Sequence, residues 1–251
     1  MNLHLSTDRK TAPMMQRKYE EGNEAYVRGP NAFGLPAIKS CWGSTPTCES
    51  MCYARKLEVV FKQTRDALER NWQLVKPHLH DPDKLEELLY AVVEQSFKYM
   101  QKWSEPEDWV FRWFWDGDIP TPEFATAIRR VCQRFPQVKF WLYTRTFNAI
   151  RRLQADNLVV YLSVDKDNVK QARHTSKTYP WVKLAFTAES WEATDALART
   201  FPDQRRGPRC PELTGKIPLV VWNEDRTGRG ACLKCGLCIT GVNNVRFSAS
   251  K

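Results

Sequence analysis

From Trp109 to Glu224 the chain alternates short apolar segments with amphipathic ones, and this alternation constrains the fold more than any other feature. Helical periodicity marks the amphipathic segments, one of which opens with the capping sequence Thr121-Pro122-Glu123. Strands that alternate with helices over short connections form a parallel sheet, because each parallel pair needs a crossover. The predicted strands are residues 109–115, 138–145, 157–165, 181–189 and 217–224.

Residues 34–40 form a further strand candidate, and two long helices are predicted after it, over 53–75 and 81–103. With this strand the sheet has about six members. The pattern predicts an α/β fold built as a partial or full βα barrel of parallel strands. A doubly wound open sheet is the alternative, although the chain has no dinucleotide-binding glycine motif and no phosphate loop.

We divide the chain into three predicted parts. Residues 1–33 are a polar N-terminal arm, irregular or partly helical, and residues 34–224 are the barrel-like domain. Residues 225–251 are a cysteine-rich C-terminal segment, which we expect to pack on the barrel mouth. Working residues are expected at the carboxyl ends of the strands, where such folds place their active sites.

Seven of the eight cysteines fall into two groups. The first group, in "KSCWGSTPTCESMCYARK", follows the first predicted strand, and the second lies in "RCPEL" and "CLKCGLC" near the end. Thiols of intracellular proteins stay reduced, so such groups indicate metal binding or catalysis more than disulfides. Cys132 stands apart on a predicted helix, where it is expected to be buried as a small apolar residue. The two groups are Cys41, Cys48 and Cys52, and Cys210, Cys232, Cys235 and Cys238.

The second group has the spacing of an iron–sulfur ligand set. Three cysteines at C-x2-C-x2-C, with a remote cysteine before a proline, resemble the arrangement of bacterial ferredoxins. Zinc and free redox thiols are the alternatives for this group. The first group supplies three thiolates, which on a four-iron cluster leave one iron open. A zinc site completed by another residue, or one site shared by both groups, stays open for these cysteines.

In its motifs the chain resembles radical S-adenosylmethionine (SAM) enzymes. "CESMCYA" is similar to the end of their cluster-binding loop, "FWDGDIPTPEF" to their glycine-rich motif after strand two, and "YLSVDKDN" to their ribose-contacting strand end. The resemblance implies one or two [4Fe-4S] clusters, bound SAM and its reductive cleavage to a 5′-deoxyadenosyl radical. It also implies that Gly117, Ser163 and Asp165 contact the cofactor, and that an electron donor acts as partner.

The whole chain is also similar to small cysteine-rich proteins of bacteriophage genomes. The shared features are C-x6-C-x3-C-Y-A early in the chain, "WDGD" and "YTRT" after two strands, and C-x2-C-G-x-C near the end. This resemblance implies a phage-encoded protein that works in the host cytoplasm. The first cysteine spacing differs from the C-x3-C-x2-C of radical SAM enzymes, and Asp-Gly-Asp replaces their Gly-Gly-Glu.

Three polar residues at predicted strand ends are catalytic candidates. Asp116 and Asp118 are candidates for contacting a substrate amine or for acid–base catalysis, and Arg145 for holding a carboxylate or phosphate. Each has a structural alternative. The aspartates suit an Asx turn, and Arg145 suits an ion pair with Asp116 or Asp118. Ser163 and Asp165 equally suit capping of the helix that follows them.

Charge and hydropathy leave several functions open. A formal charge of +9 is compatible with nucleic acid as a partner, although no nucleic-acid-binding motif is present. No secretory signal and no membrane-spanning stretch is visible in the sequence, which predicts a soluble cytoplasmic protein. The chain is thus predicted to be an iron–sulfur protein, with radical SAM chemistry as one possibility. The alternatives are a non-catalytic or electron-transfer iron–sulfur protein and a zinc-stabilised basic protein that binds nucleic acid.

Overall fold

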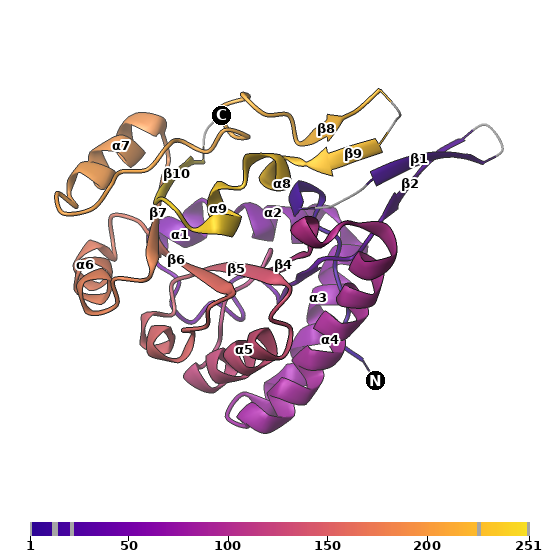
Figure 1. The fold of residues 1–251 in the computed structure, drawn as a ribbon. Helices are drawn as coiled ribbons and strands as arrows, with labels where there is room; N and C mark the ends of the chain where they lie inside the picture. Colours follow the sequence, from indigo (N-terminus) through magenta and orange to yellow (C-terminus); the bar gives the residue numbers. More distant parts are fainter. Residues whose placement is uncertain (1, 12–14, 21–22, 225–226, 250–251) are drawn as a thin grey trace.

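The computed structural model describes residues 2–11, 15–20, 23–224 and 227–249. Its main element is a six-stranded sheet in the order β3-β4-β5-β6-β7-β10, and every neighbouring pair is parallel (Figure 1). The α/β class and the parallel sheet are therefore confirmed. The strands are β3 (Ala32–Phe33), β4 (Val110–Trp113), β5 (Lys139–Thr144), β6 (Leu158–Val164), β7 (Lys183–Ala188) and β10 (Val245–Ser248).

This sheet is open. Among the described residues no backbone pairing joins its two edge strands, β3 and β10, so the prediction of a full barrel is wrong. The strands follow one another across the sheet in chain order, without the reversal that defines a doubly wound sheet, so that alternative is wrong as well. Right-handed crossovers in one constant direction place the connecting helices on one face of the sheet.

Both ends of the sheet differ from the prediction. Residues 34–40 are irregular, with a turn at 37–39, and the first strand is the shorter β3 that precedes them. Within 217–224, β8 (Val220–Trp222) belongs to a second, antiparallel sheet in the order β2-β1-β9-β8. The place beside β7 is taken by β10, where the Asn244 side chain accepts a hydrogen bond from the Leu184 amide at 2.8 Å. The other strands of the second sheet are β1 (Met15–Glu20), β2 (Asn23–Arg28) and β9 (Thr227–Gly230).

The helices begin largely where the capping residues predict. The Asp81 side chain accepts hydrogen bonds from two amides at the start of α4, and Thr121 accepts one from the Phe124 amide at the start of α5. The predicted helix over 53–75 divides at Phe61, after a β-branched pair with low helix propensity. The predicted helix after β5 is a 3-10 helix over Phe147–Arg152. The α-helices are α1 (Pro46–Ser50), α2 (Tyr53–Val60), α3 (Lys62–Val75), α4 (Pro82–Trp103), α5 (Pro122–Arg134), α6 (Val169–Thr178), α7 (Trp191–Arg199), α8 (Ala231–Cys235) and α9 (Leu237–Thr240).

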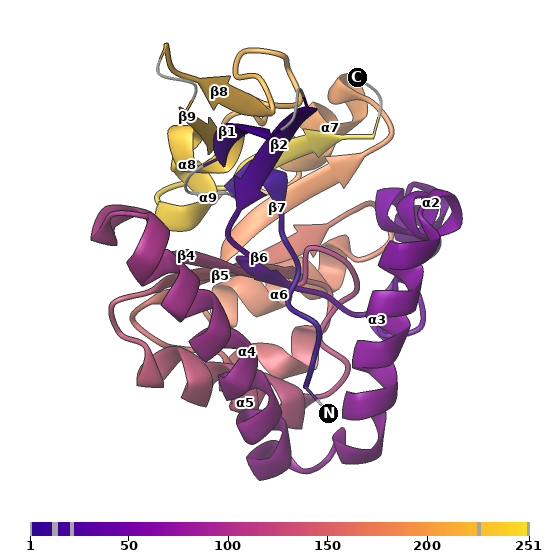
Figure 2. The same ribbon diagram turned by 90° about the vertical axis from the view of Figure 1, so that its right-hand side faces the viewer.

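The two faces of the main sheet are covered by different parts of the chain. On one face, alternate residues such as Phe140 and Leu162 pack into the large core made with α3 to α7. On the other face, Trp141 contacts Ile239 of α9. Figure 2 shows α8, α9 and the small antiparallel sheet on the opposite side of the main sheet from α4 and α5. The cysteine-rich segment thus covers the face that the crossover helices leave free.

The two edge strands of the main sheet lie outside residues 34–224, the predicted barrel-like domain. β3 falls within residues 1–33 and β10 within residues 225–251, so the edges of the sheet do not coincide with the predicted boundaries. Residues 225–226, at the second boundary, lie outside the described residues. Within the described part of the chain, no helix combines the length and the hydropathy needed to cross a membrane.

Candidate functional site

The first cysteine group occupies a single loop at the carboxyl end of β3. Cys48 lies in α1, whose first turn is capped by Thr45 through a hydrogen bond from the Cys48 amide at 3.0 Å. Cys52 caps α2, where its sulfur accepts a hydrogen bond from the Arg55 amide at 3.4 Å. Cys41 precedes both helices, and all three thiols are free and half-buried. Two adjoining helix starts therefore position Cys48 and Cys52, and Cys41 lies near Cys48 on the same loop.

This loop is attached to the carboxyl ends of β5 and β6. The Thr45 hydroxyl donates to Asp165 at 2.7 Å, and the Thr47 amide donates to Asp167 at 2.9 Å. A Cβ at Gly43 would lie 2.3 Å from the carbonyl oxygen of Arg145, so only glycine allows this approach. The first cysteine group consequently lies at the same edge of the sheet as the polar residues predicted from strand ends.

The structure brings Asp118, Arg145 and Asp165 together beside the first group. The Arg145 side chain donates through Nε to Asp165 at 3.1 Å, and its backbone amide donates to Asp118 at 2.7 Å. Asp165 is fully buried and Asp118 nearly so. Burial is the main cause that raises the pKa of Asp118 above its ordinary value. The predicted side-chain ion pair of Arg145 with Asp116 or Asp118 is wrong, because its partner is Asp165.

The predicted capping by Ser163 and Asp165 is also corrected. Helix α6 begins after Asn168, which is its N-cap residue. The Asn168 side chain accepts from the Asp165 amide at 3.0 Å and donates to the Ser163 carbonyl at 3.0 Å. The Asp165 carboxylate accepts from the Asp167 amide at 3.0 Å, which forms an Asx turn before the helix. Asp165 therefore positions the cysteine loop and Arg145. Ser163, two residues earlier in the chain, is buried in β6.

Asp116 is a buried carboxyl group without a well-formed hydrogen bond. Its side chain is 2% exposed, and neither carboxylate oxygen has a hydrogen-bond partner of good geometry among the described residues. Burial, followed by the charge of the neighbouring Glu58, raises the pKa of Asp116 to about 8. The adjacent Gly117 has φ +74°, and a Cβ there would lie 2.5 Å from the Leu35 carbonyl oxygen. Asp116 is thus held, without a partner, at the base of the cysteine loop.

The raised pKa of Asp116 predicts a pH dependence of stability. The folded-state pKa exceeds the unfolded value, so folding takes up a proton between about pH 4 and pH 8. The free energy of unfolding should therefore fall as pH rises through this window and level off above it. We expect Asp116→Asn to remove this dependence, which calorimetry at about pH 5 and about pH 8.5 would measure.

At about pH 8.5 the Asp116→Asn variant should be more stable to heat than the native chain, whereas at about pH 5 it should show no such gain. The charged or titratable groups that act on Asp116 are Glu58, Arg112 and Tyr53, and all of them remain in the variant. Asp156→Asn, at an exposed position, is the matched control and should leave the profile unchanged. Parallel pH profiles for the native chain and Asp116→Asn would contradict a raised pKa at this position.

The second cysteine group lies on the opposite face of the sheet from the large core. Helices α8 and α9 carry three of its cysteines and are joined by Gly236 in the left-handed conformation, with φ +70°. The Tyr161 hydroxyl donates to the carbonyls of Leu237 and Asn243, which fixes α9 on β6. Cys210 joins them beside β10, since its amide donates to the Arg246 carbonyl at 2.9 Å.

The thiols of the second group lie close enough to influence one another. Burial raises the pKa of Cys238 to about 11, although a hydrogen bond with Tyr143 opposes the increase, and the charges of Cys210 and Cys235 add to it. Burial also raises the pKa of Cys232 above its ordinary value, and the Cys238 charge adds to that increase. All four are free thiols and half-buried. The chain therefore gathers Cys210, Cys232, Cys235 and Cys238 into one neighbourhood.

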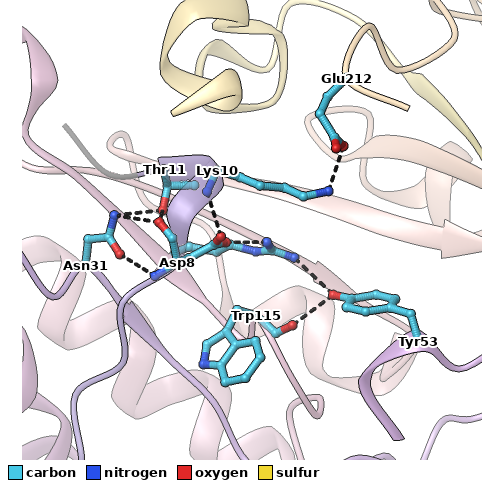
Figure 3. A network of polar contacts seen from close by, with 8 residues as sticks. Asp8, Lys10, Thr11, Asn31, Tyr53, Trp115 and Glu212 are labelled. Carbon is cyan, nitrogen blue, oxygen red and sulfur yellow. Dashed lines mark hydrogen bonds and ion pairs between the residues drawn. The ribbon is translucent and has the colours of Figure 1, made fainter. Parts of the chain in front are cut away.

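A polar network that the sequence did not predict lies between the two groups (Figure 3). Arg112 of β4 forms an ion pair with Asp8 at 2.6 Å, and both side chains are nearly buried. Lys10 pairs with Glu212 at 2.7 Å, which ties the N-terminal segment to the loop after Cys210. Arg112 is the one charged residue in the apolar run 109–115. A single charge in an otherwise apolar strand is the sequence feature that could have predicted a buried ion pair here.

Tyr53 connects this network to the first cysteine group. It directly follows Cys52, and its hydroxyl donates to the Trp115 carbonyl at 2.8 Å, as Figure 3 shows. Arg112 reaches the Tyr53 hydroxyl at 3.5 Å. Its positive charge also acts on Cys232, where it opposes the increase in pKa that burial causes. The two cysteine groups therefore flank one buried set of charges that Arg112 links.

The spacing of the side chains bears on which metal would fit. Among the described residues, no group of three or more His, Cys, Asp or Glu side chains is close enough to hold a single metal ion. Ligands of a tetrahedral zinc ion lie about 2.3 Å from the metal and so about 4 Å from one another. The described cysteines therefore provide thiol donors, three in one group and four in the other, that are not arranged as the ligands of one metal ion.

Comparisons with known proteins identify relatives across the whole chain. Residues 2–241 match the protein family described as Gene product 88. The Gene 88 protein of Mycobacterium phage L5 is 34% identical over 99% of this chain and 98% of its own length. The Gene 88 protein of Mycobacterium phage D29 is 34% identical over 100% of this chain and 99% of its own length. No solved structure matches the chain.

Proposed function

The chain belongs to the Gene product 88 family of phage proteins, and we propose that it is an iron–sulfur protein with two cysteine-ligated sites. The observation that carries the proposal is the segregation of the cysteines. Seven are half-buried and lie in two groups, whereas Cys132 is fully buried in α5 as ordinary core. In the proposal, Cys41, Cys48 and Cys52 bind one four-iron cluster, and Cys210, Cys232, Cys235 and Cys238 bind a second.

The type of donor and its spacing along the chain favour a cluster over zinc. A four-iron cluster is larger than one ion, so its thiolate ligands stand further apart than the ligands of zinc. Thiolates are also soft ligands that suit iron–sulfur clusters, and neither group brings in a histidine.

We extend the proposal to the fold and to SAM. Six parallel strands in chain order, with the crossover helices on one face, are the arrangement expected of an incomplete βα barrel. In such a barrel the first cysteine loop would lie at the mouth, beside Asp116, Asp118 and Arg145. This position supports radical SAM chemistry as the finer proposal, with an electron donor as partner.

The chain's own residues would then have separate tasks. Cys41, Cys48 and Cys52 would hold the first cluster and leave one iron without a protein ligand, and the cluster would supply an electron to a small ligand there. Arg145 uses its Nε for Asp165, which leaves its terminal nitrogens to bind a carboxylate such as that of SAM. The buried Asp116 suits an ammonium group, which would supply the partner that its oxygens lack. Asp118 fixes the backbone at Arg145, and Gly117, Ser163 and Asp165 shape the loop around the ligand.

Metal analysis of anaerobically purified full-length protein tests the proposal. We expect a brown protein with about eight iron atoms and about eight acid-labile sulfides per chain, corresponding to two four-iron clusters. A colourless protein that carries one zinc ion and no labile sulfide would overturn both the cluster and the SAM proposals. It would favour the zinc-stabilised alternative instead.

A second measurement distinguishes a radical SAM enzyme from an iron–sulfur protein that does not act on SAM. The reduced protein is examined by electron paramagnetic resonance before and after addition of SAM. We expect the cluster signal to change, because SAM would bind the open iron of the first group. An unchanged spectrum in a protein that contains the expected iron would leave the electron-transfer alternative and remove the radical SAM one.

A further inference from the structure

Helix α2 and its C-terminal boundary expose an unusual run of apolar side chains. Val59, Val60 and Phe61 are 73%, 70% and 55% exposed, and Tyr53 at the start of the helix is 57% exposed. Single exposed apolar residues are common, but three consecutive ones on a rigid element mark an interaction site. We define the α2 surface as these four residues together with the basic residues Arg55, Lys56, Lys62 and Arg65.

This orientation of α2 is fixed by specific contacts. Ala54 is buried, and Glu58 accepts a hydrogen bond from the Ala37 amide at 2.6 Å. The Tyr53 hydroxyl donates to the Trp115 carbonyl, so this ring is anchored at one end and open along its length. The apolar run consequently faces outward because the opposite side of the helix is attached to the protein.

The charges of the α2 surface select the kind of partner. Between residues 53 and 66 the chain has four basic residues and two acidic residues. Glu58 faces Ala37 and Asp116, and Asp66 forms ion pairs with Lys62 and Arg65, which leaves Arg55 and Lys56 as the cations that no carboxylate of this segment pairs with. A second copy of this chain would bring these cations against themselves, which disfavours self-association through this surface. The overall charge of +9 has the same sign, so an anionic partner fits both locally and globally.

We propose that the α2 surface binds single-stranded nucleic acid. Tyr53 and Phe61 supply exposed rings on which unpaired bases stack, and the neighbouring cations neutralise phosphates. Val59 and Val60 directly precede Phe61 and add exposed apolar surface for contact with the bases. Single strands fit better than a duplex because the bases of a duplex are already stacked on each other. The proposal goes beyond the proposed iron–sulfur function, and its surface begins at Tyr53, directly after Cys52 of the first group.

The test is equilibrium binding of the full-length protein to a fluorescent DNA strand of about 12 nucleotides, followed by anisotropy. We expect Tyr53→Ala and Phe61→Ala each to weaken binding about tenfold, while Tyr53→Phe, which keeps the ring, binds like the native chain. Tyr99→Ala removes an exposed aromatic residue on α4 and is the matched control, with no expected change. A ribonucleotide strand of the same sequence shows whether DNA or RNA is preferred.

Substitutions of charged residues test the proposal even if the aromatic variants do not fold. Lys56→Gln and Lys62→Gln are expected each to reduce the slope of log affinity against log salt by about 0.7. Lys98→Gln on α4 is the matched control and should leave the slope unchanged. Thermal unfolding confirms that each variant is folded before its affinity is compared.

Two outcomes would overturn the proposal. One is equal binding of an abasic strand with the same number of phosphates, which would show that stacking is absent. The other is displacement of the strand by poly-glutamate at equal charge, which would indicate an acidic protein as the partner of this surface. Iron and sulfide are measured in the same preparation, so the failure of nucleic-acid binding and the failure of the iron–sulfur proposal are seen separately.

Discussion

Replacing Cys41, Cys48 and Cys52 together by alanine is expected to remove about four iron atoms and about four labile sulfides per chain. In the proposal each of these thiolates supplies one iron ligand, so removing all three leaves the first cluster without protein ligands. The second group lies on α8, α9 and the loop at Cys210, so its cluster should remain. Iron and sulfide analysis of anaerobically purified variants measures the effect, and any SAM-dependent spectral change should disappear with the first cluster.

The complementary variant, with alanine at Cys232, Cys235 and Cys238, should lose the other half of the iron. Cys132→Ala is the matched control, since Cys132 is a buried thiol of α5 and should not change the metal content. Loss of all iron in either triple variant, with circular dichroism unchanged, would show one site shared by both groups. Retention of all iron in the first triple variant would exclude its cysteines as ligands.

Arg145→Ala is expected to destabilise the fold by about 3–5 kcal/mol. The substitution removes the cation that faces Asp165, whose side chain is fully buried, and leaves an unpaired carboxylate. Asp165 also holds the cysteine loop through Thr45, so its position depends on this ion pair. Chemical unfolding followed by tryptophan fluorescence would report the change in the free energy of unfolding.

The pairing is tested by combining Arg145→Ala with Asp165→Asn. Because asparagine carries no charge, the double variant should recover part of the lost stability. Arg129→Ala, at a partly exposed arginine hydrogen-bonded to Gln133 on α5, is the matched control and should change stability by about 0.5 kcal/mol or less. A loss in Arg145→Ala no larger than that of the control would contradict the structural role of the ion pair.

Local sequence signals predicted the elements well because they act over a few residues. The capping side chains of Asp81 and Thr121 bond to amides two or three positions away, so the sequence near them is sufficient to locate α4 and α5. The same holds for β5 and β6, whose apolar runs are continuous because both faces are covered. The resemblance to phage proteins was likewise carried by short motifs and is confirmed by the family match.

Contacts between segments far apart in the chain could not be predicted from local sequence patterns. The last strand was placed at 217–224 because it is apolar, but β10 occupies the position beside β7 through the long-range hydrogen bond of Asn244. The pairing of Arg145 with Asp165 was missed for the same reason. Spacing along the chain placed both residues at strand ends, and only their packing decided which carboxylate Arg145 meets.

By itself, the sequence determined the α/β class, the order of most strands and helices, and the division of seven cysteines into two groups, since periodicity, capping and spacing are properties of neighbouring residues. The tertiary structure alone decided that the sheet stays open and that the two groups flank the buried Arg112 and Asp8 pair. It also decided that Asp116 is buried without a partner. These features depend on contacts between segments far apart in the chain, where burial, charge and hydrogen bonding act only after the chain has folded.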